Sequence, residues 1–349
     1  MDIAALLTCS VEHQASDLHL SAGHPAVMRV HGDMCRIGDE PLQHSIVHAM
    51  LYGVMNDEQR KTYASHLEVD FALEISGLAR FRVNAFHQHQ GAAAVFRTIA
   101  NDIPTLQSLN APAILAELML RPSGLILVTG PTGSGKSTTL AAMVHHLNVH
   151  TQGHILTIED PIEFIHPSLQ CLVNQREVGQ TTHSFDAALR SALREDPDCI
   201  LVGEMRDLET IRLALTAAET GHLVLATLHT GSAAKTIDRM VDVFPAQEQA
   251  MVRAMLSESL LAVVSQTLCK TCHVQTTGRV AAYEIMLGTP AIRNLIREGK
   301  VAQMSSAIQT GASVGMQTLD QSLMALVRNQ FISRQEARRK ARSPELFAG

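Results

Sequence analysis

The sequence predicts an α/β protein, with a small α+β domain first and a larger domain built on a parallel sheet second. Three observations support this fold class. Strand-like runs separated by short turn signals fill residues 1–100, as in an antiparallel sheet. From residue 113 onward, apolar strands alternate with helical segments, as in a parallel sheet covered by helices. Residues 130–138 match a phosphate-binding loop and stand between a strand and a helix of this second domain.

The composition indicates a globular chain and argues against one class of partner. Of the 349 residues, 46% are hydrophobic and 18% are charged, which is enough apolar material for two or three domains. The 28 Lys and Arg are outnumbered by 34 Asp and Glu, so neutralisation of phosphates would give little affinity for nucleic acid. Aromatic residues make up only 3% and Trp is absent, which also disfavours stacking on bases.

The N-terminus and the cysteines indicate a cytoplasmic protein. Residues 1–10 lack the basic region that begins a signal peptide, and no run of about 18 apolar residues is present. We therefore expect a soluble, cytoplasmic chain. The six cysteines are scattered and do not form the framework of a secreted disulfide-rich domain, so we expect reduced thiols.

The first domain is expected to combine helices with an antiparallel sheet. Helices are predicted over residues 3–13 and around 44–66. Strands are predicted at residues 16–20, 26–30, 69–75, 79–86 and 92–99. Short turn signals separate the last three strands, which favours a meander. From the pattern alone, three charged residues of these strands are interpreted as solvated sheet-face groups: Arg80, Arg82 and Arg97.

A linker and a second domain are expected to follow. Pro104 and Pro112 interrupt any periodicity between the domains. The first domain is predicted at residues 1–100 and the linker at residues 101–112. The second domain is predicted to have its sheet core at residues 113–288 and its C-terminal helices at residues 289–349. Strands of the second domain are predicted at residues 125–128, 154–158, 199–202 and 223–228. Helices are predicted at residues 185–194, 208–219 and 247–268.

The phosphate-binding loop has the pattern G-x-x-x-x-G-K-[ST]. Its candidate nucleotide-binding residues are Gly130, Pro131, Thr132, Gly133, Ser134, Gly135, Lys136, Ser137 and Thr138. The glycines let backbone N–H groups turn toward phosphate oxygens, and the following helix adds partial positive charge at its N-terminus. Lys136 is expected at the β- and γ-phosphates, and the Ser137 hydroxyl at Mg²⁺. ATP and Mg²⁺ are therefore the predicted cofactors.

Carboxylates and a histidine follow the predicted parallel strands, where ligands of such sheets bind. They are Glu159, Asp160 and Glu163 after the second strand, Glu204 after the third, and His229 after the fourth. Several carboxylates beside a polyanion repel it, so either Mg²⁺ or a proton on one carboxyl group is needed. Many phosphate-loop enzymes carry an Asp where this chain has Gly203. We therefore assign the metal to Ser137 and Glu163 with either Glu159 or Asp160, and the alternative is that this acidic group is surface charge.

Four residues at the strand ends are candidate catalytic residues: Glu204, Glu163, His229 and His222. Glu204 is our candidate general base, positioned to deprotonate the attacking water. His229 is expected to contact the γ-phosphate. His222 stands at the start of the same strand, hence farther from the phosphates, so a structural role and a functional one are both open.

Two other features are weaker signals. Cys269-Lys270-Thr271-Cys272-His273 resembles half of a zinc site, but a single C-x-x-C supplies only two ligands and no second pair follows. A basic group near the C-terminus is interpreted as a solvated helix face, with docking on an acidic partner or a membrane surface as the alternative. Its members are Arg334, Arg338, Arg339, Lys340 and Arg342.

Together these motifs resemble a known family, the PilT-type retraction ATPases of type IV pili, within the secretion ATPases. The resemblance covers nearly the whole chain. Its shared motifs lie at residues 15–21, 130–138, 157–163, 193–198, 203–204, 220–222 and 228–230. The most diagnostic segment is Ala291 to Lys300, which is similar to the family's retraction signature. The chain departs from the family pattern at Cys269 to Thr277, which is either a remnant of the zinc site of assembly ATPases or loop drift.

The resemblance implies a PAS-like N-terminal domain, a RecA-like ATPase domain with a helical C-terminal part, and a homohexamer that binds ATP between its two domains. It implies that Arg80, Arg82 and Arg97 contact ATP, that Arg190 and Arg194 belong to the site, and that His222 is functional. It also implies a partner in the pilus platform of the inner membrane, with at most peripheral membrane association.

We therefore expect an ATP-hydrolysing motor for pilus retraction and twitching motility. One alternative is a retraction-ATPase paralogue with an accessory role. The other is a nucleotide-binding scaffold that changes shape on binding ATP without useful turnover, and the intact Lys136, Ser137, Glu163 and Glu204 argue against it.

Overall fold

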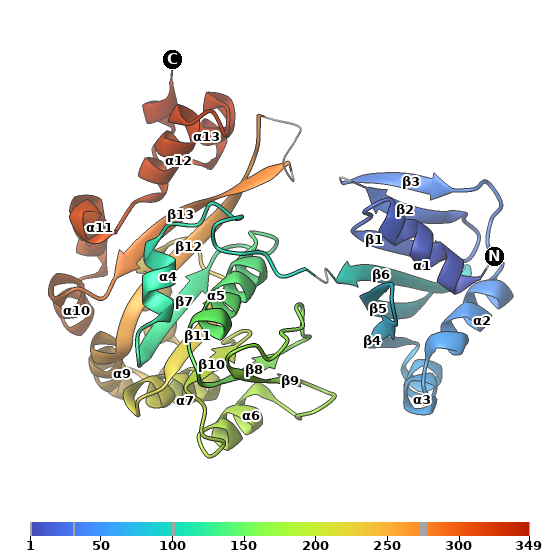
Figure 1. Cartoon of the computed structure of the whole chain (residues 1–349), viewed down its shortest axis with the longest axis horizontal. Coiled ribbons are helices and arrows are strands. Elements are labelled where there is room, and N and C mark those ends of the chain that lie inside the picture. Colours follow the sequence, from blue (N-terminus) through green and yellow to red (C-terminus); the bar gives the residue numbers. More distant parts are fainter. Residues whose placement is uncertain (1, 31, 100–101, 273–277, 349) are drawn as a thin grey trace. The chain divides into compact units, whose positions relative to one another are not determined.

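The computed structural model describes residues 2–30, 32–99, 102–272 and 278–348. The chain divides into two compact units, Met1–Asp102 and Ile103–Gly349, and each is described by itself. Figure 1 labels their helices and strands. Most of the segment expected as a linker, from Ile103 onward, belongs to the second unit, and Leu106 is buried in one of its cores.

In the described residues the first unit is a six-stranded antiparallel sheet with the order β3-β2-β1-β6-β5-β4. Its strands are β1 (Asp17–Ser21), β2 (Ala26–Val30), β3 (Asp33–Ile37), β4 (Glu68–Ile75), β5 (Ala79–Gln88) and β6 (Gly91–Ile99). Alternate residues of β5 are buried, with Phe81, Val83 and Ala85 in the core, because successive side chains of a strand point to opposite faces. The expected meander of β4, β5 and β6 is confirmed, whereas β3 was not anticipated.

Helices α1 (Ile3–Glu12), α2 (His44–Val54) and α3 (Asp57–His66) complete the core of the first unit. The single helical segment expected around residues 44–66 is in fact two helices. Asn56 separates them, because its side chain accepts a hydrogen bond from Gln59 N at 2.8 Å while Asn56 N donates to Gln59 Oε1 at 2.9 Å. This capping box begins a new helix at the next residue.

The second unit has a seven-stranded sheet in its described residues, with the order β13-β12-β7-β11-β10-β8-β9. Its strands are β7 (Gly124–Thr129), β8 (His154–Glu159), β9 (Leu172–Glu177), β10 (Cys199–Val202), β11 (Leu223–Leu228), β12 (Leu260–Lys270) and β13 (Arg279–Leu287). The pairs from β12 through β9 are parallel and β12 with β13 is antiparallel. The predicted parallel sheet is therefore confirmed.

Helices cover both faces of this sheet. They are α4 (Ile114–Met119), α5 (Lys136–His150), α6 (Phe185–Ala192), α7 (Leu208–Glu219), α8 (Ala233–Asp242), α9 (Ala246–Ser259), α10 (Pro290–Arg297), α11 (Met304–Thr310), α12 (Leu319–Arg328) and α13 (Arg334–Lys340). Central strand β7 serves two cores at once: Leu125 and Leu127 belong to one, and Ile126 and Val128 to the other. Residues that alternate along a strand face opposite sides of the sheet, so the two cores lie on its two faces.

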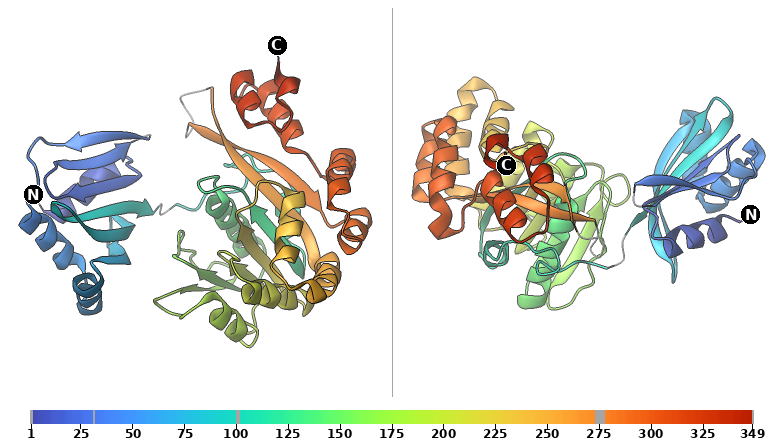
Figure 2. Two further views of the ribbon diagram at one scale, coloured as in Figure 1. Left: turned by 180° about the vertical axis from the view of Figure 1, so that it is seen from behind. Right: turned by 90° about the horizontal axis from the view of Figure 1, so that it is seen from above.

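One prediction in this unit was wrong. The long helix expected over residues 247–268 ends at Ser259, and Leu260 begins strand β12. The apolar residues that follow pair with β7, so contacts distant in sequence decide their conformation. Figure 2 shows the long β12–β13 hairpin with the C-terminal helices α12 and α13 beside it.

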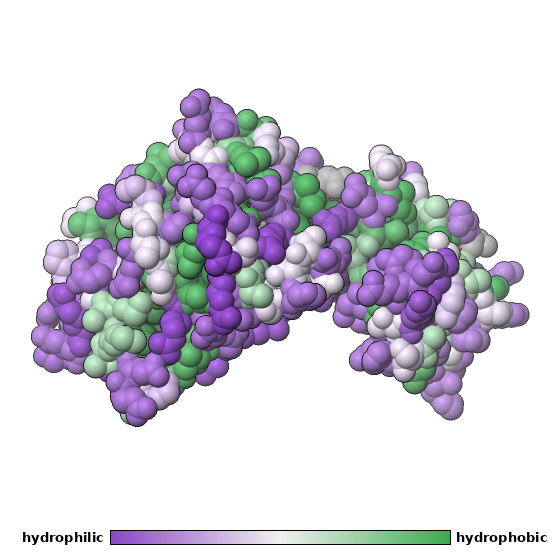
Figure 3. Space-filling model, turned by 90° about the horizontal axis from the view of Figure 1, so that it is seen from below, coloured by the Kyte–Doolittle hydropathy of each residue, from purple (hydrophilic) through white to green (hydrophobic). Residues whose placement is uncertain are grey.

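Polar and apolar residues are mixed on the surface of the molecule drawn in Figure 3. On the face drawn in Figure 3, hydrophilic residues alternate with hydrophobic ones, as on most folded proteins. Within the described ranges, no helix combines the length and the apolar character needed to cross a bilayer.

Candidate active site

The phosphate-loop residues connect β7 to α5, as the sequence predicts. Gly133 and Gly135 have φ angles of 75° and 86°, which side chains other than glycine rarely adopt. Gly130 is required for a second reason, because a Cβ atom there would lie 2.3 Å from the carbonyl oxygen of Gln266. Helix α5 begins directly at Lys136, so its N-terminus faces the loop. This arrangement suits an anion.

Lys136 is held inside the loop. Its Nζ donates to the carbonyl oxygens of Gly130 at 3.0 Å and Pro131 at 3.1 Å. Burial lowers the pKa of Lys136, while the nearby charges of Glu204 and Glu163 act in the opposite direction. Phosphate oxygens are stronger acceptors than carbonyl oxygens, so a bound polyphosphate offers this ammonium better partners.

Gln266 of β12 stabilises the phosphate loop through two hydrogen bonds. Its Nε2 donates to Ser134 O at 2.7 Å, and its Oε1 accepts from Thr139 Oγ1 at 2.8 Å. The side chain is buried. Sequence analysis missed Gln266 because it placed this segment in a helix. The available signal was a single amide side chain within an apolar, β-branched run.

We expect Gln266→Leu to loosen the loop. The change leaves the buried Ser134 carbonyl and the Thr139 hydroxyl without their partner, which costs about 1–3 kcal/mol of the free energy of unfolding. Nucleotide affinity should fall as well. Denaturant unfolding and ATP titration measure the two effects. Thr139→Val is the matched comparison, since it removes only one of the two bonds and should cost less; equal costs would contradict the bracing role.

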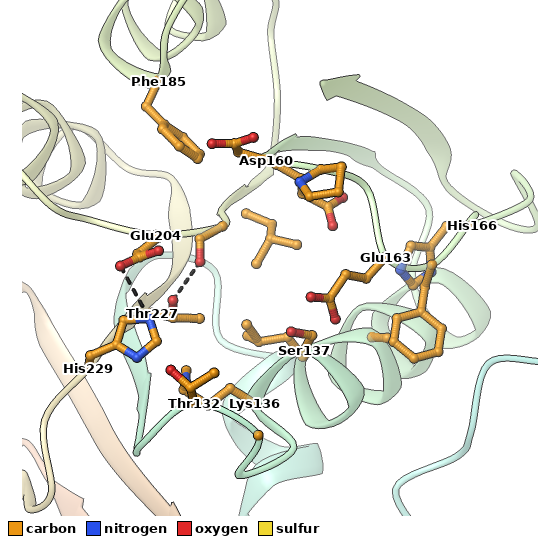
Figure 4. A pocket seen from close by; sticks show the side chains of 18 residues that line it. Thr132, Lys136, Ser137, Asp160, Glu163, His166, Phe185, Glu204, Thr227 and His229 are labelled. Carbon is orange, nitrogen blue, oxygen red and sulfur yellow. Dashed lines mark hydrogen bonds and ion pairs between the residues drawn. The ribbon is translucent and has the colours of Figure 1, made fainter. Parts of the chain in front are cut away.

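The acidic loop after β8 lies across the pocket from α5. Ile162 N donates to Glu177 Oε2 at 3.0 Å, and Gln175 Nε2 donates to Phe164 O at 2.9 Å, so β9 fixes the path of this loop. Figure 4 shows the Glu163 carboxylate pointing toward Ser137 and Asp160 lying beside Phe185. Of the acidic group, Glu163 is thus directed at the hydroxyl expected to bind Mg²⁺.

Glu159 has an unusual environment. Burial raises the pKa of its carboxyl group to about 7, although Thr157 Oγ1 and Gln175 Nε2 donate hydrogen bonds to it at 2.7 and 3.2 Å. It is thus partly protonated near neutral pH without a cation. Sequence analysis offered Mg²⁺ or a proton on one carboxyl group as ways to relieve the repulsion of a polyanion, and the choice between them stays a prediction.

The raised pKa predicts a pH-dependent stability that Glu159→Gln removes. In the unfolded chain the carboxyl titrates near 4.5, and in the folded protein near 7. The folded state therefore binds the proton more tightly, so the free energy of unfolding falls by about 3 kcal/mol as pH rises from 4.5 through 7.

Denaturant titrations from pH 4.5 to 8, without Mg²⁺, measure this contribution as the difference between the two proteins. Other titrating groups are common to both. The stability of wild type should decline relative to Glu159→Gln over this interval; parallel profiles would contradict the assignment.

Glu204 follows β10 and pairs with an arginine and a histidine. Its Oε2 lies 2.7 Å from Arg206 Nη2. Its Oε1 lies 3.2 Å from His229 Nε2 (Figure 4). Burial raises the pKa of Glu204, but the hydrogen bond and charge of Arg206, with the charges of His229 and Lys136, outweigh it and lower the pKa overall. The carboxylate is therefore ionised at neutral pH. Arg206 was missed in the sequence because nothing marked it among the other arginines.

One pocket gathers many of the predicted residues. Its lining includes Thr132, Gly133, Lys136, Ser137, Glu159, Asp160, Glu163, Glu204 and His229, together with unpredicted His166, Phe185 and Thr227. The oxygen donors Ser137 and Glu163 suit Mg²⁺, which commonly binds one or two carboxylates and completes its shell with water and phosphate. The described part of the chain contains no cluster of three His, Cys, Asp or Glu residues placed to hold a metal by themselves.

Other candidates lie elsewhere. His222 is at the opposite end of β11 from His229, with its Nδ1 3.0 Å from Ala217 O. Arg190 of α6 pairs with Asp186 and Glu209, and Arg194 is exposed just after that helix. That His222, Arg190 and Arg194 take part in the site stays a prediction.

The candidate arginines of the first unit stay predictions too. Arg80 and Arg82 belong to β5 and Arg97 to β6. Arg82 Nε lies 3.9 Å from Asp70 Oδ1, and Arg97 Nε lies 2.9 Å from Asp17 Oδ1. Within their own unit, the latter two therefore have acidic neighbours.

The half zinc motif lies at the end of β12 and partly outside the described residues. Cys269 is buried at the end of β12, Cys272 is exposed, and both thiols are free. His273 lies outside the described residues. All six cysteines are free, as expected for reduced thiols.

Comparison with known proteins extends the similarity over both units. A family model for type II/IV secretion system proteins matches residues 1–339. PilT of Pseudomonas aeruginosa, a type IV pilus retraction ATPase, is 65% identical over 99% of this chain and 100% of its own length. A twitching motility protein of Neisseria gonorrhoeae is 57% identical over 98% of this chain and 91% of its own.

A solved structure resembles the whole chain. The crystal structure of the pilus retraction motor PilT with bound ADP matches with a TM-score of 0.92 and 43% identity. The match covers 99% of this chain and 98% of the other. The relative with the same fold therefore holds a nucleotide.

Proposed function

The chain belongs to the type II/IV secretion system protein family, and from this premise we propose that it is an ATP-hydrolysing motor that powers retraction of a type IV pilus. One observation carries the proposal: a single pocket in which the phosphate loop faces Glu204 and His229. Similarity along the whole chain to a pilus retraction ATPase supports retraction as the work performed. Pilus disassembly and twitching motility are the expected outputs.

Binding of ATP rests on the loop and the start of α5. Backbone N–H groups there carry partial positive charge and bind the phosphates. Lys136 adds a full positive charge at the β- and γ-phosphates. Ser137 and Glu163 hold Mg²⁺, with Glu159 nearby as the second carboxylate. When bound, Mg²⁺ would neutralise part of the negative charge of the phosphates. Its positive charge would also favour the ionised form of Glu159.

Hydrolysis rests on Glu204. Glu204 is ionised at neutral pH, and in this proposal it accepts a proton from the water that attacks the γ-phosphate. Arg206 and His229 fix its two oxygens in place. His229 also contacts the γ-phosphate, so loss of that phosphate changes the partners of the histidine and, through it, of Glu204.

The assembly is the further part of the proposal. We propose a homohexameric ring that engages the pilus platform of the inner membrane from the cytoplasm, with at most peripheral attachment to the membrane. The resemblance of the motifs to retraction ATPases supports this assembly.

Gene deletion tests the motor. Loss of a retraction ATPase should leave cells with excess surface pili and without twitching motility, and the wild-type gene should restore both. Unchanged piliation and motility would favour an accessory paralogue. Purified protein that binds ATP as an assembled ring and does not hydrolyse it would favour the scaffold.

A further inference from the structure

An ion pair between buried Glu284 and partly exposed Arg342 holds the turn that follows His229. Glu284 of β13 is 2% exposed, and its Oε2 lies 2.6 Å from Arg342 Nη1. Glu284 Oε1 accepts from Ala233 N at 2.7 Å, and Arg342 Nη2 donates to Gly231 O at 3.1 Å. Arg342 was expected on a solvated basic face, and this contact corrects that expectation.

The turn after His229 connects β11 to α8. Further bonds secure it: Ser232 Oγ accepts from Lys235 N at 3.2 Å, and the hydroxyls of Thr230 and Thr236 are 2.7 Å apart. His229 immediately precedes the turn and lies 3.2 Å from Glu204. The path of the turn therefore sets where the imidazole lies.

Arg342 is also tied to the C-terminal helices. Asp320, in the first turn of α12, accepts from the backbone N–H groups of Arg342 at 2.8 Å and Ser343 at 3.1 Å. The Arg342 side chain is 39% exposed, whereas Glu284 is buried. A shift of the C-terminal segment would therefore withdraw the arginine to solvent and leave a buried carboxylate with one partner fewer.

We propose that Arg342 and Glu284 are positioning residues for His229, and that the C-terminal helices influence ATP hydrolysis through this pair. The proposal rests on the hydrolysis proposed above. Neither residue lines the pocket around the phosphate loop and Glu204. Their effect therefore passes through the turn to His229 and Glu204.

The first test is Arg342→Ala in the full chain. Turnover should fall about tenfold, with KM for ATP changed less than twofold, because the phosphate loop is untouched. Arg338→Ala is the matched control: it removes an exposed arginine of α13 and should keep the wild-type rate. A wild-type rate for Arg342→Ala, or an equal loss in Arg338→Ala, would overturn the proposal.

A second set of variants separates positioning from general destabilisation. Arg342→Ala with Glu284→Gln removes the unpaired buried charge, so the melting temperature should recover while turnover stays low. Arg342→Lys restores a cation and should recover part of the rate. In a His229→Ala background, Arg342→Ala should lower turnover little further, because both substitutions act through the His229 side chain. Full recovery of turnover in the double variant, or additive losses with His229→Ala, would overturn the proposal.

Hydrogen exchange tests the turn independently of turnover. Amides of residues 229–236 should exchange faster in Arg342→Ala than in wild type or Arg338→Ala. If wild type proves inactive, the proposed function fails, and this exchange still decides whether the pair holds the turn. Unchanged exchange would show that it does not.

Discussion

Glu204→Gln should bind ATP as wild type does and hydrolyse it roughly 10²–10⁴-fold more slowly, the range typical of a lost general base. An amide cannot accept the proton of the attacking water. The substitution keeps the shape, and its oxygen still accepts from Arg206, so the contacts that hold the side chain are largely preserved. Mg²⁺-dependent ATP hydrolysis, measured beside nucleotide binding, gives the two quantities.

Glu219→Gln is the matched control for this change. Glu219 is exposed at the end of α7 and does not line the pocket, so its substitution should leave the rate as it is. Equal rates in wild type and Glu204→Gln would still leave an ATPase but would move the base elsewhere. Glu163, which points toward Ser137 in Figure 4, would then be the next residue to substitute.

The parts of the site that sequence predicted are those fixed by local pattern. A phosphate loop carries its glycines, lysine and serine at set spacings, so nine residues identify both the turn and its ligand. Parallel strands end at one edge of a sheet, so Glu204 and His229 were expected together and lie 3.2 Å apart. His222 precedes the first residue of β11 and His229 follows its last, as the sequence predicted.

The parts that sequence missed depend on pairing between distant segments. The run from Leu260 fits a helix or a strand when considered alone, and its pairing with β7 decides the outcome. The role of Gln266 in stabilising the phosphate loop follows only from this strand pairing. Strand β9 lies at the sheet edge and is mostly polar, so it gave no strand signal, although its Glu177 fixes the acidic loop.

Lys136→Ala should abolish measurable ATP binding and hydrolysis, a stronger defect than that of Glu204→Gln. The Lys136 side chain is buried, and it supplies the full positive charge next to the β- and γ-phosphates. Its removal leaves the polyphosphate beside Glu163 and Glu204 with less to offset their repulsion. We expect at least a hundredfold loss of ATP affinity, measured by titration calorimetry or with a fluorescent nucleotide.

This defect should arise without unfolding. Burial lowers the pKa of Lys136, so keeping the lysine charged in the folded protein costs free energy, and its removal relieves that cost. The lost bonds to Gly130 and Pro131 act in the other direction. The midpoint of thermal unfolding without nucleotide should therefore change little, while the rise that ATP gives to wild type should disappear. Lys61→Ala, an exposed change in the first unit, should keep that rise; an ATP-dependent rise in Lys136→Ala would contradict the assigned role.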